Sequence, residues 1–309
     1  QMDPKQKIVN ILNQANGVVS GETLSAELGV SRVAIWKHIK GLVQSGMPIV
    51  ASPKGYRITR DPDSLLPWEF GAWQECVHYF RETASTMDEA MLLARKGCPD
   101  FTVAVAQRQT RGRGRLQRTW LSTDGGLYFT VVVRPDIPMM LAGLVNLAAA
   151  IDMGNLLRSL YEVDARLKWP NDILVNKYKI CGILSQMEAE GDQVVHMNIG
   201  IGLNVNNTPE TEAPMAISLK ALLGRPVPRR EILVAFLDVF EKRMSTFDPL
   251  GIIKAWQSNN VTLGRQVRVL TVKEMLEGTA VDVDPHGGLI LQLGDGTRQT
   301  VMVGDCFHD

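Results

Sequence analysis

The chain has 309 residues, about twice the most common size of a single domain, so two or three domains are expected. Its composition, 45% hydrophobic and 21% charged, is that of a globular protein and excludes a disordered or fibrous one. Basic and acidic side chains both number 33, which excludes an overall charge that would draw the whole chain to nucleic acid or to a membrane.

Residues 1–60 form the first predicted region, and they are locally basic, with eight Lys and Arg against three Asp and Glu. Apolar residues recur at helical spacing in three successive segments, which predicts three helices. Ser20 and Ser31 stand where N-caps of the second and third helices are expected, and Gly29-Val30 fits the turn between them. Residues 53–58 predict a strand–turn–strand wing.

This first region is predicted to bind DNA as a winged helix-turn-helix. Its third helix is expected to bury Ile35, Ile39 and Val43, which leaves a basic face for the major groove of DNA. The same pattern is compatible with a protein-binding or dimerisation module. The DNA-binding candidates on the helix and the wing are Ser31, Arg32, Trp36, Lys37, Lys40, Lys54 and Arg57.

Residues 61–63 and Pro67 predict a linker, after which strands and helices are mixed. Strands joined by short turns, with long helices elsewhere, favour an α+β domain over a doubly wound parallel sheet. Strands are expected at residues 102–106, 127–133, 172–175, 180–185 and 194–199. Helices are expected at residues 141–160, 229–247 and 250–258.

The last region, residues 263–309, is predicted to be a small β-barrel. Four short strands, at residues 267–270, 278–281, 289–293 and 300–303, are separated in the later part by glycine-rich hairpin turns at 287–288 and 294–296.

Four cysteines are present, and no two of them have C-x-x-C spacing, which argues against a cysteine zinc site or a redox dithiol. Sparse thiols fit a reducing compartment. The N-terminal residues lack the apolar core of a signal peptide. The most apolar stretch, residues 141–151, is too short to span a bilayer. We therefore expect a soluble cytoplasmic protein without a membrane partner.

The densest group of cations is the run from Arg111 to Arg118, Arg-Gly-Arg-Gly-Arg-Leu-Gln-Arg. Its glycines allow a close approach of the backbone to a ligand, and its guanidinium groups can neutralise a carboxylate and a phosphate. Such a loop suits a reaction in which one anion must attack another. An RG-rich nucleic-acid segment or a solvated loop would be the alternative, but the run lies between two strands that are expected to be buried.

Three further motifs could contribute to this site. Residues 168–172, Lys-Trp-Pro-Asn-Asp, are either the end of a strand or a site for phosphate and magnesium. Lys179 precedes a strand in which Gly182 leaves room for a ligand, although a solvated turn lysine is the simpler reading. Residues 85–88 fit a helix capping box, whose free N–H groups could also hold a polar ligand.

Other nucleotide and metal motifs are missing. The sequence has no P-loop, no H-E-x-x-H and no G-x-S-x-G, and its five histidines are scattered. A bound nucleotide would therefore be held by something other than a P-loop.

The order of these motifs resembles that of the biotin–protein ligases. It runs from Ser85-Thr86 through Gln109, the arginine loop and Trp120 to residues 168–172, 179–184 and 202–204. The resemblance covers nearly the whole chain and, with the winged helix, looks like the bifunctional bacterial type that also represses the biotin operon. It implies a winged helix-turn-helix at 1–62, a class II synthetase-like catalytic domain with a mixed sheet at 68–262, and an SH3-like barrel at 263–309.

The resemblance implies a two-step reaction. Biotin attacks ATP, with Mg²⁺, to give biotinyl-5′-AMP and pyrophosphate, and a lysine of the biotin carboxyl carrier protein domain of acetyl-CoA carboxylase then takes the biotinyl group. Lys179 and Arg115 would be catalytic, and the metal ligands remain unassigned. Biotin would meet Ser85, Thr86, Met87, Gln109, Gly112, Arg113, Gly114, Arg115 and Lys179. ATP or the adenylate would meet Arg118, Trp120, Lys168, Asn171, Asp172 and Asn204.

Three features of the sequence depart from the family pattern. Met87 stands where the pattern often has Asn, so its backbone is the expected contact. Leu116-Gln117 replaces an Arg-Gly pair, which suggests slower ordering of the loop or altered retention of the intermediate. Trp36 replaces a smaller polar residue, so an operator sequence cannot be carried over.

Two other functions fit the same motifs. One is a regulator that binds biotin or its adenylate without turnover, and the other is a lipoate–protein ligase. The winged helix could also be a structural remnant. If it represses transcription, we expect the adenylate to favour a DNA-binding homodimer formed through the central sheet.

Overall fold

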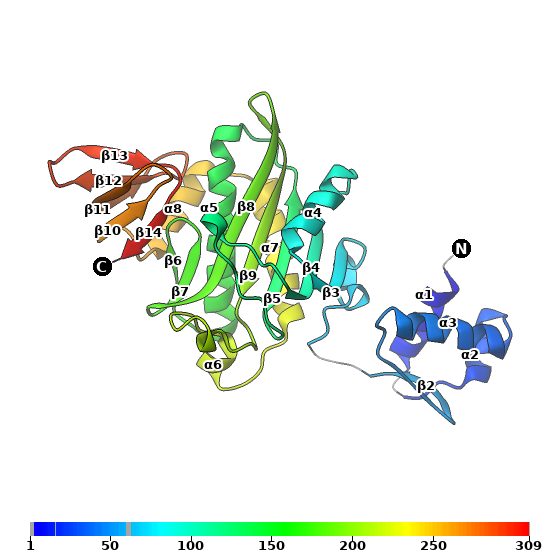
Figure 1. Cartoon of the computed structure of the whole chain (residues 1–309). Helices are drawn as coiled ribbons and strands as arrows, with labels where there is room; N and C mark the ends of the chain where they lie inside the picture. Colours follow the sequence, from blue (N-terminus) through cyan, green and yellow to red (C-terminus); the bar gives the residue numbers. More distant parts are fainter. Residues whose placement is uncertain (1–2, 16, 60–62, 309) are drawn as a thin grey trace. The chain divides into compact units, whose positions relative to one another are not determined.

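The computed structural model describes residues 3–15, 17–59 and 63–308. The chain divides into two compact units, Gln1–Leu66 and Pro67–Asp309 (Figure 1). Asp61 and Pro62 of the predicted linker lie outside the described residues.

The first unit contains the three predicted helices and the wing. Its elements are α1 (Pro4–Gln14), α2 (Gly21–Leu28), α3 (Arg32–Gln44), β1 (Ile49–Ser52) and β2 (Gly55–Ile58). The predicted caps are confirmed, because the Ser20 hydroxyl accepts the Thr23 N–H at 3.0 Å and the Ser31 hydroxyl accepts the Ala34 N–H at 3.2 Å. The wing begins at Ile49, earlier than predicted, and residues 53 and 54 form its turn.

One core prediction for this unit is wrong. Ile35 and Ile39 are buried, but Val43 is 46% exposed and Leu42 is buried in its place. At 3.6 residues per turn, a face that contains positions 35 and 39 returns at 42 or 43, and here position 42 points inward.

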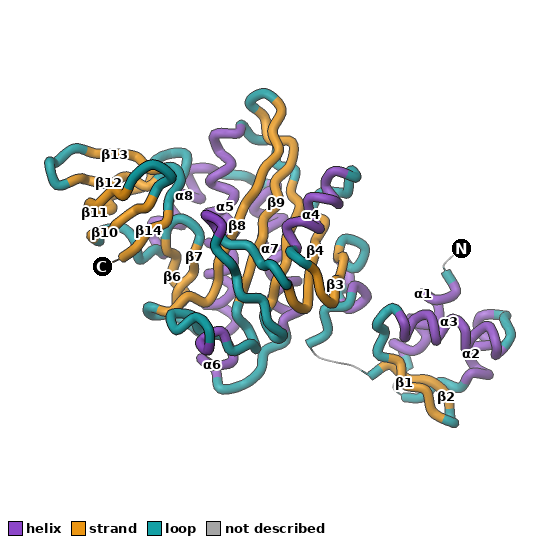
Figure 2. The backbone as a smooth tube through the Cα atoms, in the orientation of Figure 1, coloured by secondary structure: helices purple, strands orange, loops and turns teal. Residues whose placement is uncertain are grey.

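The second unit is built on a seven-stranded sheet with the order β3-β4-β5-β9-β8-β7-β6 (Figure 2). Its strands are β3 (Val77–Thr83), β4 (Thr102–Gln109), β5 (Leu127–Val133), β6 (Ala165–Lys168), β7 (Asp172–Val175), β8 (Tyr178–Glu190) and β9 (Gln193–Leu203). Only β3 and β4 run parallel, so the sheet is mixed and the α+β prediction is confirmed.

Helices cover both faces of this sheet. They are α4 (Thr86–Arg95), α5 (Ala142–Tyr161), α6 (Leu219–Leu223), α7 (Arg229–Ser245) and α8 (Pro249–Asn259). Short 3-10 turns lie at Pro67–Glu69, Gly71–Trp73, Arg115–Gln117, Met139–Leu141 and Pro209–Thr211.

The alternation of β5 shows which helix lies on which face. Thr130 and Val132 face α4, whereas Phe129 packs edge-on against Phe236 of α7, with ring centroids 5.5 Å apart. Because successive residues of a strand point to opposite faces, α4 and α7 lie on opposite sides of the sheet.

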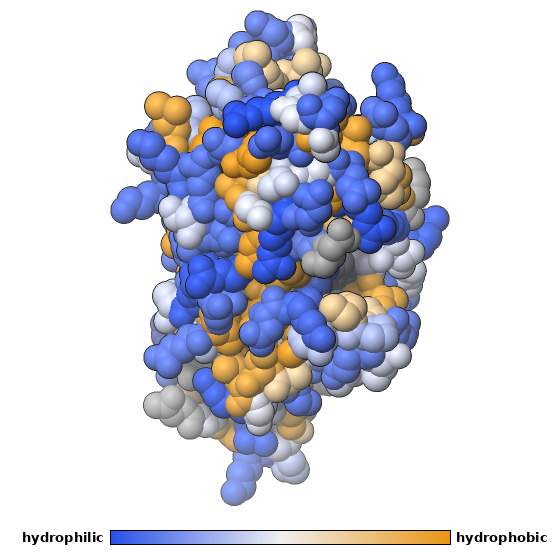
Figure 3. Space-filling model, turned by 90° about the vertical axis from the view of Figure 1, so that its left-hand side faces the viewer, coloured by the Kyte–Doolittle hydropathy of each residue, from blue (hydrophilic) through white to orange (hydrophobic). Residues whose placement is uncertain are grey.

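Helix α5 is the core helix of this unit. The segment Met139–Tyr161 is long and apolar enough to cross a membrane by length and composition alone, but 72% of its most apolar window is buried inside the fold. It packs against α7, α8 and the sheet. Figure 3 views the molecule from the side of the C-terminal strands, where hydrophilic residues cover most of the visible surface.

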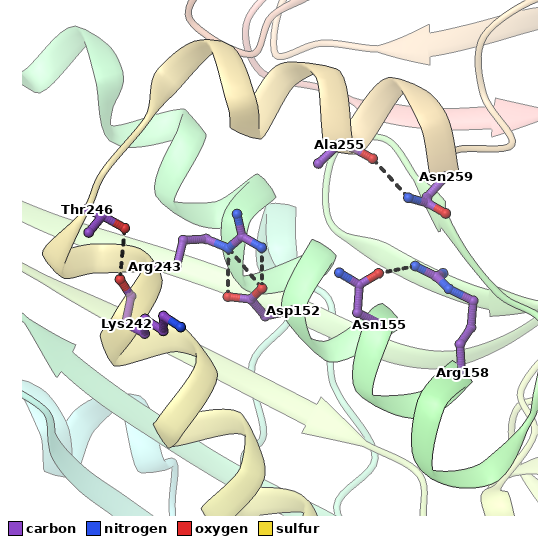
Figure 4. A network of polar contacts seen from close by, with 8 residues as sticks. All are labelled: Asp152, Asn155, Arg158, Lys242, Arg243, Thr246, Ala255 and Asn259. Carbon is purple, nitrogen blue, oxygen red and sulfur yellow. Dashed lines mark hydrogen bonds and ion pairs between the residues drawn. The ribbon is translucent and has the colours of Figure 1, made fainter.

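A buried ion pair joins α5 to α7 (Figure 4). The Arg243 guanidinium donates through Nε to both oxygens of Asp152, at 2.8 and 2.9 Å, and through Nη2 to Oδ1 at 2.6 Å. Asp152 is fully buried, and burial raises the pKa of its carboxyl while Arg243 opposes that rise. Removing either partner would leave a charge without compensation, so the pair fixes the relative position of the two helices.

The C-terminal strands form a five-stranded antiparallel sheet with the order β13-β12-β11-β10-β14. They are β10 (Gln266–Leu270), β11 (Met275–Val283), β12 (Leu289–Leu293), β13 (Arg298–Val301) and β14 (Asp305–His308). The two glycine-rich turns are where they were predicted. The fourth predicted strand ends at Val301 rather than 303, and β14 was not predicted.

Candidate functional site

The N-terminus of α4 is tied to the end of β4 by buried polar contacts. Gln109 Oε1 accepts the Thr86 N–H at 2.8 Å and the Thr86 hydroxyl at 3.2 Å, and that hydroxyl accepts a hydrogen bond from the hydroxyl of Thr130 at 2.8 Å. Gln109 Nε2 donates to the Ser122 hydroxyl at 2.8 Å, which donates in turn to the Trp120 carbonyl at 3.1 Å. Residues far apart in the sequence therefore form one network.

The capping box predicted for this helix is only partly present. The Ser85 hydroxyl accepts the Met87 N–H at 3.3 Å, as an N-cap does. The Asp88 carboxylate turns outward and pairs with Arg113 at 2.6 Å. The helix start thus contributes an acidic partner to the arginine loop.

The arginine loop is folded back on itself between β4 and β5. Gly112 accepts the Trp120 N–H at 2.9 Å, and a Cβ at Gly112 would lie 2.3 Å from the Trp120 carbonyl oxygen. Glycine is therefore required at this point. Leu116 lies in the left-handed region, with φ 48° and ψ 45°, a conformation that costs a non-glycine residue about 1–2 kcal/mol.

Two cations of this loop are paired with carboxylates. Arg113 meets Asp88, and Arg118 meets Asp305 of β14 at 2.7 Å while lying 5.6 Å from the centroid of the Phe307 ring. Burial lowers the pKa of Arg115, and the carboxylates of Asp305 and Asp172 oppose that effect. Two guanidinium groups of the loop are thus ion-paired with carboxylates from other elements.

Residues 168–172 form the tight connection between β6 and β7. Lys168 and Asp172 pair across the strands, with a cis peptide between Trp169 and Pro170. The Asn171 side chain donates to the Ile183 carbonyl at 2.6 Å, which fastens the connection to β8. Asp172 Oδ1 lies 2.7 Å from Lys179 Nζ. The second and third predicted motifs therefore meet.

Trp120 lies against the glycines of the sheet. A Cβ at Gly202 would be 2.4 Å from its ring, and one at Gly182 would be 2.9 Å away. The space that Gly182 was predicted to leave for a ligand is thus filled by Trp120. Lys179 Nζ lies 5.2 Å from the ring centroid. Among the described residues, the indole N–H is one of few buried polar groups without a hydrogen-bond partner.

These elements enclose a cavity of about 170 Å³ on the α4 side of the sheet. The predicted residues that line it are Ser85, Thr86, Met87, Gln109, Arg113, Gly114, Arg115, Arg118, Trp120, Lys168, Asn171, Asp172 and Lys179. Two predicted residues are not among the lining residues: Gly112 lines a neighbouring hollow, and the buried Asn204 accepts a hydrogen bond from Asn207 at 2.9 Å. The volume is below that of common ligand sites, because the loop and Trp120 are folded into it.

The C-terminal sheet supplies part of the cavity that the sequence did not predict. Asp305, Cys306 and Phe307 line it. The Trp169 N–H donates to the Thr262 hydroxyl at 3.0 Å, and its indole N–H donates to the Gly287 carbonyl at 3.0 Å. No local pattern marks these residues, because they lie more than 90 positions from the motif that they support.

Thr262 also connects the cavity wall to the end of β14. Its hydroxyl lies 3.2 Å from Nε2 of His308. Burial and the neighbouring cations Lys168 and Arg265 lower the pKa of His308 to about 4, so this imidazole is neutral near pH 7.

No cluster of three or more His, Cys, Asp or Glu residues is found within residues 3–15, 17–59 and 63–308. The carboxylates closest to the cavity are those of Asp172 and Asp305, and each already has a cationic partner. This donor set fits a metal such as Mg²⁺, which binds through one or two carboxylates together with substrate phosphates. It does not form an all-protein cage.

In the first unit, the predicted DNA-binding side chains lie on the surface. Ser31, Arg32, Trp36, Lys37 and Lys40 are all exposed on or beside α3, and so are Lys54 and Arg57 of the wing. Lys40 Nζ lies 5.1 Å from the centroid of the Trp36 ring.

Comparison with known families finds three matches along the chain. Residues 79–204 match the biotin/lipoate A/B protein ligase family, residues 4–57 match a helix-turn-helix domain, and residues 262–309 match the C-terminal domain of biotin protein ligases.

Individual proteins extend these matches over the whole length. The chain is 34% identical to the bifunctional ligase/repressor BirA of Bacillus subtilis over 313 aligned positions, which cover 96% of each protein. It is 32% identical to the biotin–[acetyl-CoA-carboxylase] ligase of Mycobacterium tuberculosis, over 80% of this chain and 95% of that one. The biotin protein ligase of Aquifex aeolicus, solved in complex with biotin and ATP, matches at a TM-score of 0.62 and 28% identity, covering 75% of this chain and 98% of that one.

Proposed function

This chain belongs to the family of bifunctional biotin–protein ligases and repressors, and from that premise we propose how its residues carry out the two activities. The second unit is the ATP-dependent biotin ligase, and the first unit is the DNA-binding repressor domain. The observation that carries the residue assignment is that Lys179, Arg115 and the N-terminus of α4 converge on one cavity.

In the first step, a carboxylate oxygen of biotin attacks the α-phosphorus of ATP. A new P–O bond forms, the bond to the β-phosphate breaks, and pyrophosphate leaves with its electron pair. Two anions must approach each other, so cations have to offset their repulsion. Lys179 and Arg115, which both line the cavity, supply this charge, and Arg118 closes the loop over the product.

Ion-pair exchange accompanies substrate binding in this proposal. Arg113 and Arg118 are held by Asp88 and Asp305 at 2.6 and 2.7 Å. Biotin's carboxylate and the nucleotide phosphates would take the places of these side chains. The exchange changes the free energy only a little, because one charge-assisted hydrogen bond replaces another.

The adenine is assigned to Trp120. Its ring is large and flat, and its indole N–H has no partner in the described part of the chain. Trp120 would stay seated against the glycines of β8 and β9 and stack on the base from the wall of the cavity. Lys168, Asn171, Asp172 and the more distant Asn204 are assigned to the nucleotide as well. Ser85, Thr86, Met87, Gln109, Gly112 and Gly114 are assigned to biotin.

Magnesium is assigned to the nucleotide. It would neutralise phosphate charge, with Asp172 or Asp305 as the carboxylate ligand.

In the second step, the ε-amine of a lysine on the biotin carboxyl carrier domain attacks the carbonyl carbon of biotinyl-5′-AMP. An amide bond forms, the C–O bond to the phosphate breaks, and AMP leaves. The closed arginine loop protects this mixed anhydride from water until the carrier arrives.

Incubation with biotin, MgATP and an apo carrier domain tests the ligase assignment. We expect the carrier to gain the mass of one biotinyl group on a single lysine. Tight binding of biotin without any mass shift of the carrier would favour the non-catalytic sensor. If biotin and lipoate compete, a carrier that gains mainly the mass of the lipoyl group would favour a lipoate ligase.

For repression, the adenylate is proposed to favour a homodimer through the central sheet, and two copies of the first unit would then contact two half-sites of a biotin operator. We place both activities in the cytoplasm. We also assign the C-terminal sheet to the SH3-like barrel class and the central domain to the class II synthetase-like class. Sedimentation with and without biotin and MgATP tests the dimer. An association constant that does not depend on ligand would contradict it.

A further inference from the structure

Helix α3 exposes two large apolar side chains on its outer surface. Val33 is 64% exposed and Trp36 is 52% exposed, although the helix buries Ile35, Ile39 and Leu42 against the rest of the unit. The two residues are three positions apart, so they are neighbours on one face. They are the second and fifth residues of α3, at the end that enters the major groove in a helix-turn-helix.

The surroundings of this pair are concave and mainly basic. A groove between the starts of α2 and α3 and the wing is lined by Arg32, Val33, Trp36, Lys54 and Tyr56, with Glu22 as its acidic member. Lys40 Nζ lies 5.1 Å from the centre of the Trp36 ring, which holds the ammonium group beside the indole. The apolar pair is therefore embedded in a surface whose charge complements a polyanion.

Double-stranded DNA is the polyanion that this shape and charge fit. Arginine and lysine at the rim can contact phosphates, but such contacts position the protein on the duplex and do not read the base sequence. Val33 and the carbon face of Trp36 carry no group that could read hydrogen-bond donors or acceptors. In the major groove, the apolar group that distinguishes one base from the others is the C5-methyl of thymine.

Resting on the repressor function proposed above, we propose that Val33 and Trp36 determine operator specificity by contacting thymine methyl groups in the major groove. Each operator half-site would contain thymine at the positions opposite these two side chains. Stacking of Trp36 on a base is disfavoured, because bases of an intact duplex are already stacked and their faces are covered.

The test begins with a pool of DNA duplexes that carry a random central segment. The full-length protein, supplied with biotin and MgATP, selects the bound duplexes, and each thymine of the selected sequence is then replaced in turn by 2′-deoxyuridine. This replacement removes one methyl group and keeps every hydrogen-bonding group. We expect at least one replacement in each half-site to weaken binding about fourfold, the factor that corresponds to about 0.8 kcal/mol for one buried carbon.

Variants assign the methyl contact to the two side chains. Each of the variants Trp36→Ala and Val33→Ser should bind thymine and deoxyuridine duplexes equally at the sensitive position that its own side chain contacts. Val43→Ser is the matched control, because Val43 is also exposed on α3 but lies at its other end, and it should keep the full discrimination. Far-UV circular dichroism and biotin transfer to the carrier confirm that each variant is folded.

Two results would overturn the inference while leaving the repressor function intact. One is selective binding by the unaltered protein that no deoxyuridine replacement weakens, and the other is discrimination that stays unchanged at every sensitive position in both Trp36→Ala and Val33→Ser. Failure to enrich any sequence would overturn the repressor function itself, and the inference with it.

Discussion

The proposed DNA-binding surface of the first unit and the cavity of the second unit are built in opposite ways. The surface is made by side chains between Ser31 and Arg57, on one helix and one hairpin, and almost all of it is local in sequence. The cavity collects residues from Ser85 to Phe307. A local surface can be altered one side chain at a time, whereas an assembled cavity depends on residues that never touch the ligand.

Substitutions in the cavity and substitutions on the surface of α3 are therefore expected to have different effects. In the cavity, a residue that supports the wall from a distance should affect substrate binding as well as stability. On the surface of α3, each residue should act on its own.

Lys179→Met should lower the rate of biotinyl-adenylate formation about 100- to 1000-fold, because it removes a cation from the point where negative charge develops. The rate of biotin-dependent ATP–pyrophosphate exchange measures this. Lys177→Met is the matched control, since Lys177 packs its ammonium group near the Tyr178 ring and is not a lining residue of the cavity. A similar rate in both variants would remove Lys179 from the mechanism.

Gly202→Val should weaken ATP binding about 10- to 100-fold, the value of losing one base–aromatic stack. A Cβ at this position would lie 2.4 Å from Trp120, so the indole would be displaced. Equilibrium binding of a non-hydrolysable ATP analogue checks this. Gly294→Ala, whose added Cβ meets nothing within 4 Å, should leave binding unchanged. Unchanged affinity in Gly202→Val would show that the present position of Trp120 is irrelevant to the nucleotide.

Thr262→Val tests the support that the C-terminal sheet gives to the cavity. The change keeps the shape but leaves the buried Trp169 N–H without an acceptor, which should lower the free energy of unfolding by about 1–3 kcal/mol. The KM for ATP should rise several-fold, while the KM for the carrier domain stays the same. Thr300→Val, at an exposed position of β13, should change neither value. A loss of stability with an unchanged KM for ATP would show that Thr262 stabilises the fold but does not affect nucleotide binding.

His308→Gln should flatten the dependence of stability on pH. In the folded chain the pKa of His308 is lowered from 6.5 to about 4, so between these values the unfolded chain binds more protons. Stability should therefore fall as the pH drops from 6.5 towards 4, by on the order of 1 kcal/mol after solvent screening. Chemical denaturation at several pH values measures this, and His78→Gln, at an exposed position, should keep the original slope.

The local elements could be predicted from the sequence. The helices and caps of the first unit, the buried strand at 127–133 and the glycine turns of the C-terminal sheet all follow from periodicity and turn chemistry. The burial of Val43 was predicted wrongly because helical periodicity allows either position 42 or position 43 to face the core, and only packing decides between them.

The contacts between distant segments could not be predicted. The roles of Asp305, Thr262 and Gly287 arise because the C-terminal sheet packs beside the turn at Trp169. The pairing of Asp88 with Arg113 likewise needs the loop conformation, which no propensity encodes. The motifs predicted most of the residues that line the cavity, whereas the contacts that support these motifs depend on the folded structure.

The central claim is that the cations around this cavity bring a carboxylate and a nucleotide phosphate together. The most direct measurement is acid quenching of the protein after incubation with biotin and ATP labelled at the α-phosphate, with Mg²⁺ and without any carrier. We expect about one equivalent of labelled biotinyl-5′-AMP per chain together with released pyrophosphate. Bound biotin and bound ATP with neither product would contradict it.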